Sequence, residues 1–315
     1  MRAAISRVCT GEPFRHEALL YLDADAYARA SVRFIEAGLA ADEPVLVAVP
    51  QSNIDLLRDH LGAAAGQVRF VDMRRAGRNP NRIIPWVLRA FLDEHPDRRV
   101  RIIGEPIWPG RAPEEVPLAI QHEALINRAF AGRLATILCP YDADQLDASI
   151  LSFANRTHPV VSDGEQARPC ASYTDPERVV ATFNEPLPDR SAPAAELVFT
   201  RATLGELRHR VARFASRLGL ADARAGDLQI AVNEVATNTV VHGSGAGRLR
   251  MWPEADRVVC EIQGPGHIAD WLAGRLVPPE DSPRGRGLLV ANLLCDLVET
   301  HTHPTSTTTR LHMRR

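Results

Sequence analysis

The sequence predicts an α/β protein of two domains, and three observations lead to that prediction. The chain has 315 residues, which exceeds the usual size of a domain built around a single hydrophobic core. From residue 16 to residue 158, short apolar runs alternate with longer amphipathic ones, which is typical of a doubly wound, mostly parallel sheet. Beyond a proline-rich stretch, two helix-length segments precede several strand-length ones, which predicts an α/β sandwich.

The composition is that of a globular chain and excludes several kinds of enzyme. Hydrophobic residues make up 45% of the chain and charged residues 24%, as in ordinary folded domains. Every basic residue is arginine and no lysine occurs, which excludes P-loop, Schiff-base and lysine-dependent kinase sites. The formal net charge of -2 provides no overall attraction to nucleic acid or anionic membrane, so we expect neither as a direct partner.

The cysteines and the apolar runs both indicate a cytoplasmic protein. No apolar core of signal-peptide length occurs near the N-terminus, and no run approaches the roughly 20 apolar residues of a spanning helix. The cysteines are dispersed, odd in number and without a C-x-x-C pair, which predicts reduced and mostly buried thiols. They are Cys9, Cys139, Cys170, Cys260 and Cys295.

The expected elements of the N-terminal domain follow from this alternation. The strand candidates are rich in Val, Ile and Leu, as expected when both faces of a sheet are covered. They span 18–22, 44–49, 68–73, 100–104 and 134–140, and the helix candidates span 26–41, 52–61, 83–95, 114–130 and 143–156. Functional residues in such sheets usually follow the carboxyl ends of strands.

A linker and a second set of elements follow. Residues 159–196 are rich in proline and polar residues, which predicts a linker, with a short helix near 177–183 as one option. The expected domains are therefore 14–160 and 196–315, joined by 161–195. In the second domain we expect helices over 204–218, 223–242 and 287–297, and strands over 196–199, 248–252, 258–262 and 307–313.

The segment from Asp227 to Gly243 contains the most informative pair of polar residues. Glu234 and Asn238 are four residues apart, so on a helix their Cβ atoms lie on one face, about 5–6 Å apart. A carboxamide oxygen is a hard ligand suited to magnesium, and a carboxylate one turn earlier could accept a proton. Taken alone, the pair also fits the polar edge of an ordinary amphipathic helix.

Two glycine turns lie downstream of this helix. Gly285 and Gly287 precede an apolar helix candidate, where backbone amides and the helix dipole favour a phosphate. Gly264 and Gly266 follow a strand candidate, and residues 269–284 between the two turns have the length and proline content of a lid. A simple helix-initiating turn explains Gly285 and Gly287 equally well.

In order and spacing, these motifs resemble the GHKL (Bergerat) ATPase superfamily over about 120 residues. The resemblance is closest to the RsbW/RsbA group of anti-sigma factors, which act as serine kinases or sequester a partner protein. It implies ATP and Mg²⁺ as cofactors, a sigma factor or an anti-sigma factor antagonist as partner, and a homodimer formed through this domain. It implies a general base at Glu234 and a magnesium ligand at Asn238. The other implied pocket residues are Asn233, Thr237, His242, Gly264, Gly266, Arg284, Gly285, Arg286, Gly287, Leu288 and Thr308.

One departure from the family pattern concerns adenine recognition. The family has an aspartate two residues before a glycine of the first turn, but Ile262 or Gly264 occupies that position here, depending on which glycine is aligned. Losing that hydrogen bond costs roughly 1.5–3 kcal/mol, about ten- to a hundredfold in affinity. Glu261 and Asp270 are candidate substitutes, although Glu261 is expected to point to the other face of its strand.

Residues 14–160 are similar to the MEDS sensory domain (methanogen/methylotroph, DcmR type), a RecA-like α/β fold. The resemblance depends on unusual strings in family order, including Arg15-His16-Glu17, Gly77-Arg78-Asn79-Pro80, Gly104-Glu105-Pro106, His122-Glu123 and Cys139-Pro140-Tyr141-Asp142. It implies an unknown small-molecule signal as ligand. Polar residues that follow the strands form the candidate signal site: Glu105, Trp108, Arg111, His122, Tyr141 and Asp142.

The histidines of this domain are expected to have structural roles. His122-Glu123 could begin an H-E-x-x-H zinc motif, but Ile126 occupies the position of its second histidine. His16 and His158 are too isolated in the sequence to be argued as metal ligands. Trp108 and Tyr141 are more often packing residues than ligand contacts.

Two functions remain open from the sequence. One is an anti-sigma regulator whose C-terminal domain phosphorylates a serine or threonine of its antagonist, with Glu234 as base, Asn238 as magnesium ligand, and Arg284 and Arg286 neutralising phosphate charge. The other is a pure binding module that sequesters its partner, which the missing adenine aspartate favours. A sensor histidine kinase fragment is disfavoured because no helical segment with a phospho-accepting histidine precedes the ATPase-like part.

Overall fold

A computed structural model describes residues 13–189, 194–243, 245–279 and 285–315. The chain divides into two compact units. The first comprises the residues up to Gly77 together with Trp86–Val179, and the second comprises Arg78–Pro85 together with Val180–Arg315.

The first unit contains a seven-stranded sheet in the order β3-β2-β4-β5-β1-β6-β7. All neighbouring strands are parallel except β6 and β7, which are antiparallel. The predicted mostly parallel α/β architecture is therefore confirmed. The strands are β1 (Phe14–Tyr21), β2 (Val45–Val49), β3 (Val68–Asp72), β4 (Val100–Gly104), β5 (Ala135–Asp142), β6 (Val160–Ser162) and β7 (Ala167–Pro169).

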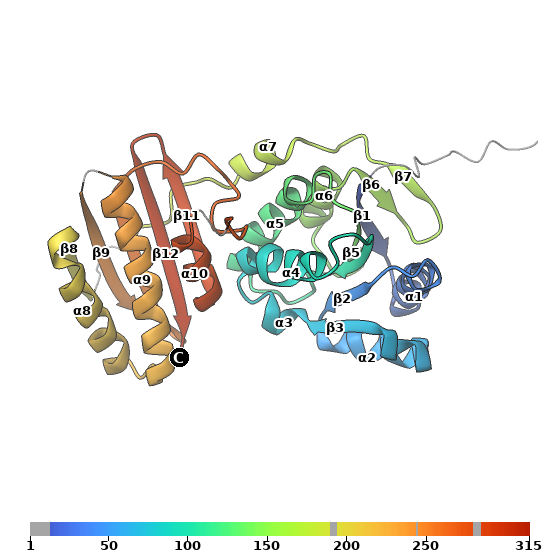
Figure 1. The fold of residues 1–315 in the computed structure, drawn as a ribbon, viewed down its shortest axis with the longest axis horizontal. Helices are drawn as coiled ribbons and strands as arrows, with labels where there is room; N and C mark the ends of the chain where they lie inside the picture. The colour runs from blue at the N-terminus through green and yellow to red at the C-terminus, as the bar shows by residue number, and fades with distance from the viewer. Residues whose placement is uncertain (1–12, 190–193, 244, 280–284) are drawn as a thin grey trace, which may run out of the picture. The chain divides into compact units, whose positions relative to one another are not determined.

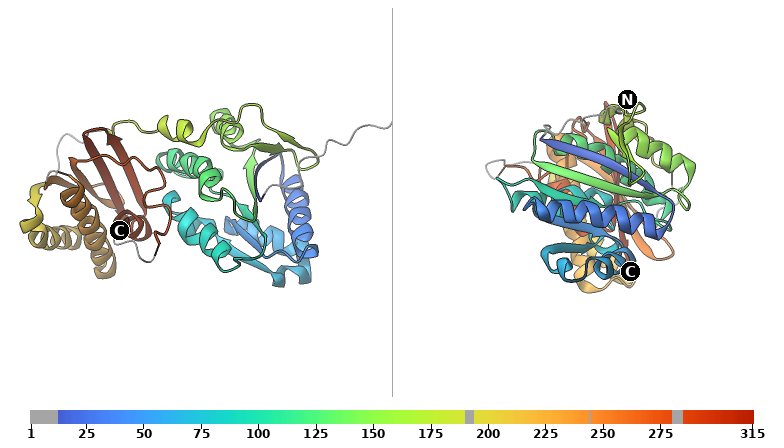
Figure 2. Two further views of the ribbon diagram at one scale, coloured as in Figure 1. Left: turned by 45° about the horizontal axis from the view of Figure 1, so that its top comes forward. Right: turned by 90° about the vertical axis from the view of Figure 1, so that its right-hand side faces the viewer.

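Helices lie on both faces of this sheet (Figure 2). Successive residues of a strand point to opposite faces, so Leu19 and Leu138 join the core under α1 and α2, whereas His16 and Cys139 point toward α5 and α6. The α-helices are α1 (Ala24–Ala40), α2 (Gln51–Leu61), α3 (Met73–Ala76), α4 (Arg89–Asp93), α5 (Val116–Ala129), α6 (Ala148–Thr157) and α7 (Pro176–Ala181). Shorter turns of the first unit are η1 (Gly62–Gln67) and η4 (Pro113–Glu115), whereas η2 (Pro80–Arg82) belongs to the second unit and η3 (Ile84–Leu88) spans the boundary between the two units in the sequence.

Two expectations for this part of the chain need correction. The helix predicted over 83–95 is a π-helical turn at Ile84–Leu88 followed by the short α4, because Pro85 has no N–H to donate along a regular α-helix. The segment interpreted as linker from residue 159 holds the β6–β7 hairpin, in which β6 pairs in parallel with β1. Strands this short, bordered by proline and glycine, are hard to distinguish from a linker in sequence.

The second unit is an antiparallel sheet with helices packed on one face (Figure 1). Its strand order is β11-β12-β10-β9-β8, and α9 contacts both α8 and α10. The predicted α/β sandwich is confirmed. The elements are β8 (Ala195–Thr200), η5 (Arg201–Thr203), α8 (Leu204–Arg217), α9 (Asp222–His242), β9 (Ala246–Pro253), β10 (Arg257–Pro265), α10 (Gly287–Leu294), β11 (Leu297–His303) and β12 (Ser306–Arg314).

The end of α10 differs from the sequence expectation. The helix predicted to reach residue 297 ends at Leu294, because Cys295 adopts an extended backbone and Asp296 N–H donates to His312 O. Strand β11 begins directly afterwards and was not predicted. Residues 293–298 are apolar except for Asp296, and the periodicity of so short a segment does not distinguish a helix from a buried strand.

Across the described ranges, none of the helices combines the length and the apolarity needed to span a bilayer.

Candidate functional site

Helix α9 forms one wall of the C-terminal site. Its apolar positions follow helical spacing and are buried against the sheet, as predicted, including Leu228, Ala231, Val232 and Val235. The helix ends at His242, where the backbone turns away from helical geometry at Gly243. An added Cβ at Gly243 would lie 2.4 Å from Pro265 O. Only glycine therefore lets the end of α9 approach the turn after β10 this closely.

A cavity of about 460 Å³ opens beside this end of α9. Its size falls within the range of roughly 300–1,000 Å³ usual for small-molecule sites. Its wall combines α9, the turn after β10, the segment before α10, α10 itself and β12. The lining residues are Val235, Asn238, Thr239, His242, Gly264, Pro265, Gly266, His267, Ile268, Asp270, Leu272, Ala273, Gly274, Leu276, Val277, Pro278, Pro279, Gly285, Leu288, Thr307 and Thr309.

Glycines let the backbone come close to α9 at two further points. A Cβ on Gly264 would lie 2.1 Å from Cγ2 of Thr239, and one on Gly287 would lie 2.5 Å from Nδ2 of Asn238. Gly266 and Gly285 have φ values of 122° and 94°, which side-chain-bearing residues rarely adopt. Both glycine turns therefore lie against the same end of α9.

The predicted pocket residues divide into two groups. Asn238, His242, Gly264, Gly266, Gly285 and Leu288 line the cavity. Three predicted residues of α9 are half-buried and are not among the residues described as lining the cavity: Glu234, Asn233 and Thr237. Arg286 directly precedes α10 with an exposed side chain, and Gly287 contacts Asn238 without lining the cavity. Arg284 lies outside the described residues.

Threonines of β12 supply hydroxyl groups to the cavity, with a shift of one residue from the prediction. Thr307 and Thr309 line it, whereas Thr308 does not. Because side chains alternate along a strand, Thr308 points to the opposite face of the sheet. The register of β12 with β10 sets which threonines face inward, and that register cannot be inferred from four consecutive threonine or serine residues.

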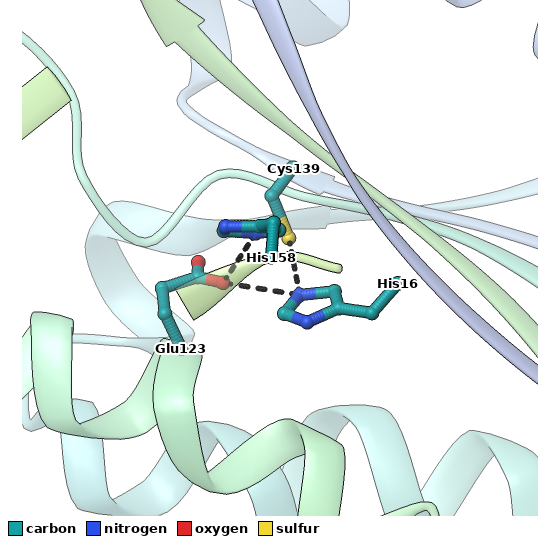
Figure 3. A group of neighbouring side chains, drawn as sticks. All are labelled: His16, Glu123, Cys139 and His158. Atoms are coloured by element: carbon teal, nitrogen blue, oxygen red, sulfur yellow. Dashed lines mark hydrogen bonds and ion pairs between the residues drawn. The ribbon is translucent and has the colours of Figure 1, made fainter. Parts of the chain in front are cut away.

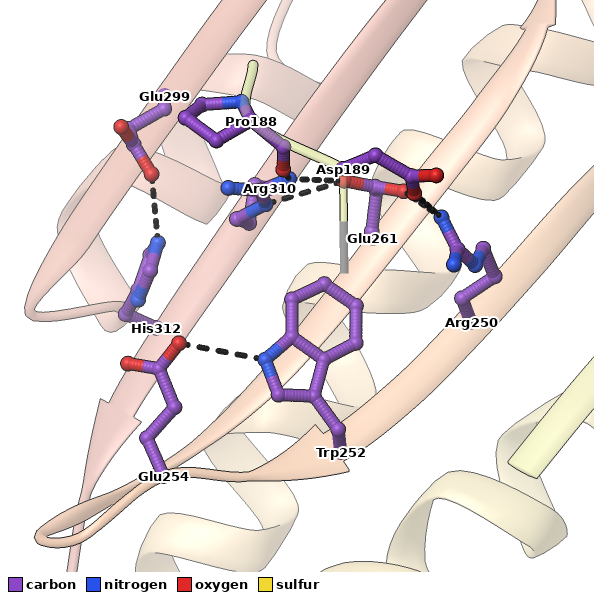
Figure 4. Close-up of polar contacts among 9 residues, drawn as sticks. All are labelled: Pro188, Asp189, Arg250, Trp252, Glu254, Glu261, Glu299, Arg310 and His312. Carbon is purple, nitrogen blue, oxygen red and sulfur yellow. Dashed lines mark hydrogen bonds and ion pairs between the residues drawn. The ribbon is translucent and has the colours of Figure 1, made fainter. Parts of the chain in front are cut away.

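The structure describes both positions at which the family's adenine aspartate was expected, Ile262 and Gly264. Ile262 pairs with Thr309 across the sheet and is 1% exposed within the apolar core. Glu261 points to the other face, as expected, where it accepts from Nε of Arg310 at 3.0 Å and faces Arg250 at 3.3 Å (Figure 4). Asp270 lines the cavity, and its Oδ1 accepts from Leu272 N at 2.9 Å. Of the two candidate substitutes, only Asp270 reaches the cavity.

In the first unit, two predicted signal-site carboxyl groups lie at adjacent strand ends. Glu105 directly follows β4, Asp142 ends β5, and these strands pair in parallel. The pKa of Glu105 is raised to about 8, mainly by burial and also by the charge of Asp142, while Asn53 opposes the shift by donating from Nδ2 at 2.8 Å. A protonated Glu105 is therefore favoured at neutral pH.

The other predicted signal-site residues occupy different surroundings. Arg111 lies 4.4 Å from the ring centroid of Trp108 and donates to Gly77 O at 2.8 Å, which makes it part of a buried loop framework. Tyr141 packs edge-on against His158, at 5.6 Å between ring centroids. His122 is buried on α5. The structure thus brings Glu105 and Asp142 together and puts Tyr141 and the Trp108–Arg111 pair into separate clusters.

A cluster of four buried side chains lies on the face of this sheet that α5 and α6 cover (Figure 3). His16 of β1, Glu123 of α5, Cys139 of β5 and His158 after α6 are each 0–1% exposed, and their ligand-type atoms all lie within 4.8 Å of one another. Oε2 of Glu123 lies 3.2 Å from Nε2 of His16 and 3.1 Å from Nε2 of His158. Burial and the neighbouring His158 lower the pKa of His16 to about 4. We call these residues the histidine cluster.

Comparison with known families agrees with this geometry. Residues 15–159 match the family model of MEDS, the methanogen/methylotroph DcmR sensory domain. Residues 197–313 match that of the histidine kinase-like ATPase domain. The chain contains both domains. Among curated proteins, none matches it. A sensory-type domain joined to a kinase-like ATPase domain makes this protein a signalling regulator.

Sequence reasoning missed residues in both domains. In the ATPase domain, no motif distinguished Thr307 and Thr309 from Thr308. In the MEDS domain, the histidine cluster joins positions separated by 107, 16 and 19 residues, so no local spacing could reveal it. The available signal was that His16, Cys139 and His158 each lie in or beside an apolar segment.

Proposed function

We propose that the ATPase domain binds ATP with magnesium and acts as an anti-sigma regulatory kinase under the control of the MEDS domain. The supporting observation is the cavity itself, in which Asn238 and both glycine turns converge. The partner is a sigma factor or its antagonist, the signal is a small molecule bound by the MEDS domain, and the working form is a homodimer in the cytoplasm.

The residues present fit a nucleotide in part. The apolar residues that line the cavity between Leu272 and Pro279, together with the hydroxyls of Thr307 and Thr309, suit a base and sugar. The carboxamide of Asn238 would hold magnesium together with phosphate oxygens and water. That ion would supply charge neutralisation to the phosphates. Asp270 is the carboxylate among the described lining residues and is the candidate acceptor for the adenine amino group.

Phosphoryl transfer would need one base from this chain. Glu234 lies one turn before Asn238 on α9. It would accept the proton of a serine or threonine hydroxyl while that oxygen bonds to the γ-phosphorus. The bond from the γ-phosphorus to the β–γ bridging oxygen would break, and ADP would leave. Arg284 and Arg286 are the arginines that we assign to phosphate charge.

A second candidate function is sequestration of the partner without catalysis. It is favoured by the residues at the two candidate positions for the adenine-binding aspartate, Ile262 and Gly264, because neither side chain can accept a hydrogen bond. It is also favoured by the position of Glu234 outside the described cavity lining. In that case the same surface of the domain would inhibit its partner by binding alone.

A phosphotransfer assay separates the two candidates. Full-length protein is incubated with labelled ATP, magnesium and candidate antagonist proteins. We expect label on the antagonist, and a loss of at least a hundredfold in rate for Glu234→Ala. The control is Glu206→Ala, which removes an exposed carboxylate of α8 that pairs with Arg210. No transfer by the unmodified protein, or equal transfer by Glu234→Ala, would rule out the kinase and leave sequestration.

A further inference from the structure

We propose that His16, Glu123, Cys139 and His158 of the MEDS domain form a closed, four-ligand site for a divalent transition metal ion, and that zinc is the ion they fit best. The proposal is independent of the nucleotide site. It arises from the hydrogen bonds around the cluster, from its charge and from its dimensions.

The outer hydrogen bonds of both histidines leave their Nε2 atoms as acceptors. Nδ1 of His158 lies 2.8 Å from Ala154 O, and a carbonyl oxygen only accepts, so the proton resides on Nδ1. Nδ1 of His16 lies 3.1 Å from Oδ1 of Asn127, whose own Nδ2 donates to Thr157 O at 2.7 Å and to Ala124 O at 3.2 Å. In their neutral forms, both imidazoles therefore turn an unprotonated Nε2 inward.

Of the four inward-facing groups, the Cys139 thiol is then the one with a proton to donate, and the remaining nitrogen and oxygen atoms repel one another unless a cation lies among them. Nε2 of His16 approaches Sγ of Cys139 at 3.3 Å and Oε2 of Glu123 at 3.2 Å. Within the described residues, neither oxygen of Glu123 nor Nε2 of His158 has a hydrogen bond of acceptable geometry. A buried carboxylate without donors is costly, because burial removes its hydration. These are the features of a ligand set arranged around an ion.

Charge and ligand type indicate zinc. A Cys thiolate and a Glu carboxylate each contribute one negative charge, so a divalent ion would make the buried site neutral. Two imidazoles, a thiolate and a carboxylate are all common zinc ligands, and their mixed hardness disfavours magnesium and calcium. Histidine ligands of zinc typically donate their other N–H to a carbonyl or carboxylate. His158 and His16 both have such an outer partner, a backbone carbonyl and an amide oxygen.

The dimensions of the cluster agree with tetrahedral coordination. Zinc bonds of 2.0–2.3 Å imply neighbouring ligand atoms about 3.3–3.7 Å apart. The three contacts of 3.1–3.3 Å are close to that spacing, and the complete set lies within 4.8 Å. Small side-chain rotations would equalise these distances. Four protein ligands, all buried, leave no position for substrate, so the site is structural or thiol-responsive rather than hydrolytic.

The experiment uses the full-length chain, first as purified and then after treatment with a chelator and a reductant. Elemental analysis should find about one zinc per chain, and the chelated chain should bind one cobalt(II). The cobalt form should show tetrahedral ligand-field bands and a thiolate-to-cobalt charge-transfer band, both abolished by excess zinc. If chelation unfolds the domain and zinc restores its circular dichroism spectrum, the proposal is equally supported.

Matched variants assign the ligands. Cys139→Ser should lose the charge-transfer band, whereas Cys170→Ser, which changes a half-buried thiol of the same domain that bonds Asn155 O, should keep it. The proposal is overturned if the folded, unmodified chain binds neither zinc nor cobalt(II) stoichiometrically. It is also overturned if the charge-transfer band survives in Cys139→Ser. The result on the unmodified chain decides the matter even where a variant does not fold.

Discussion

The cavity of the ATPase domain and the histidine cluster of the MEDS domain differ in how the sequence builds them. Most of the cavity wall comes from three continuous segments: the end of α9, the turn after β10 and the residues leading into α10. The histidine cluster takes one residue from each of four elements, and these are far apart in the sequence. The first site is open and glycine-rich. The second is closed and has no glycine among its members.

This difference shows which kinds of site a single sequence can reveal. Residues four apart on a helix, or glycines on either side of a turn, keep their spacing wherever the domain places them. Residues on neighbouring parallel strands come together only through the strand order, which no local pattern specifies. The two sites also differ in how their polar groups are stabilised. Polar groups in the open cavity can interact with solvent or a ligand, whereas the buried polar groups of the histidine cluster need partners within the protein.

The largest expected effect concerns the buried carboxyl group of Glu105 and is a pH dependence. Its pKa is raised from 4.5 to about 8, so the folded state keeps a proton that the unfolded chain releases between those values. Glu105→Gln should therefore be more stable than the unmodified protein, by about 1.4 kcal/mol per pH unit from pH 4.5 to 8. Above pH 8 the difference should stay constant.

Thermal denaturation of both proteins across this pH range measures the effect. At pH 4, where Glu105 is protonated in both states, the two should unfold with nearly equal stability, which serves as the internal control. Equal stability at pH 8 as well would contradict the assigned burial of an ionisable group at this position.

The next effect tests how closely the glycine turn approaches α9 in the open site. Gly264→Ala should destabilise the ATPase domain by about 1–3 kcal/mol and weaken nucleotide binding, because the new Cβ would lie 2.1 Å from Cγ2 of Thr239. Thr239→Ser removes that methyl group and keeps the hydroxyl, which donates to Val235 O at 3.0 Å. Denaturant unfolding of the double variant should recover most of the loss; simple additivity would mean that these groups do not touch.

A comparable effect is expected for Asn127, whose side chain forms a hydrogen bond with His16 of the histidine cluster. Asn127→Ala should weaken zinc binding about 10- to 100-fold, since Asn127 orients the His16 ring. Asn155→Ala is the control, because that amide donates to Leu151 O outside the cluster. Zinc competition against a chromophoric chelator compares the two; equal affinities would show that the outer hydrogen bond does not prepare the site.

The smallest expected effect tests the register of β12. Thr309→Val should weaken nucleotide binding about tenfold, as expected for the loss of one hydrogen bond within a pocket. Thr308→Val changes the neighbouring residue on the opposite face and should leave affinity unchanged. If Thr308→Val has the larger effect in a fluorescent-nucleotide titration, the cavity described here is not the nucleotide site.

Much of the fold could be predicted from the sequence, and the failures have physical causes. Apolar periodicity identified α8, α9 and the strands β1–β5, because these elements each bury a continuous face. It missed β11, where six residues that are apolar except for Asp296 fit a helix or a strand equally well, and the short β6–β7 hairpin, in which β6 pairs with β1. The secondary-structure propensities of the residues cannot predict such pairing, because it depends on which distant strand lies beside β6 in the folded protein.

The candidate site followed the same pattern. Asn238 and Gly264 were predicted from local motifs, and both line the cavity. Thr309 was not predicted as a lining residue, because strand register decides its orientation, whereas Asp270 was named from the sequence as a candidate substitute for the adenine aspartate and does line the cavity. Glu234 shows the limit of helical spacing: it shares a face with Asn238, yet the end of the helix, and not its middle, meets the glycine turns.

The most direct test of the account is calorimetry of the full-length protein with ATP and magnesium. We expect one site per chain with measurable heat below millimolar nucleotide, and at least tenfold weaker binding for Asn238→Ala, which lines the cavity beside Gly287. The absence of binding at millimolar ATP, or unchanged binding by Asn238→Ala, would contradict the proposal that this cavity is a nucleotide site.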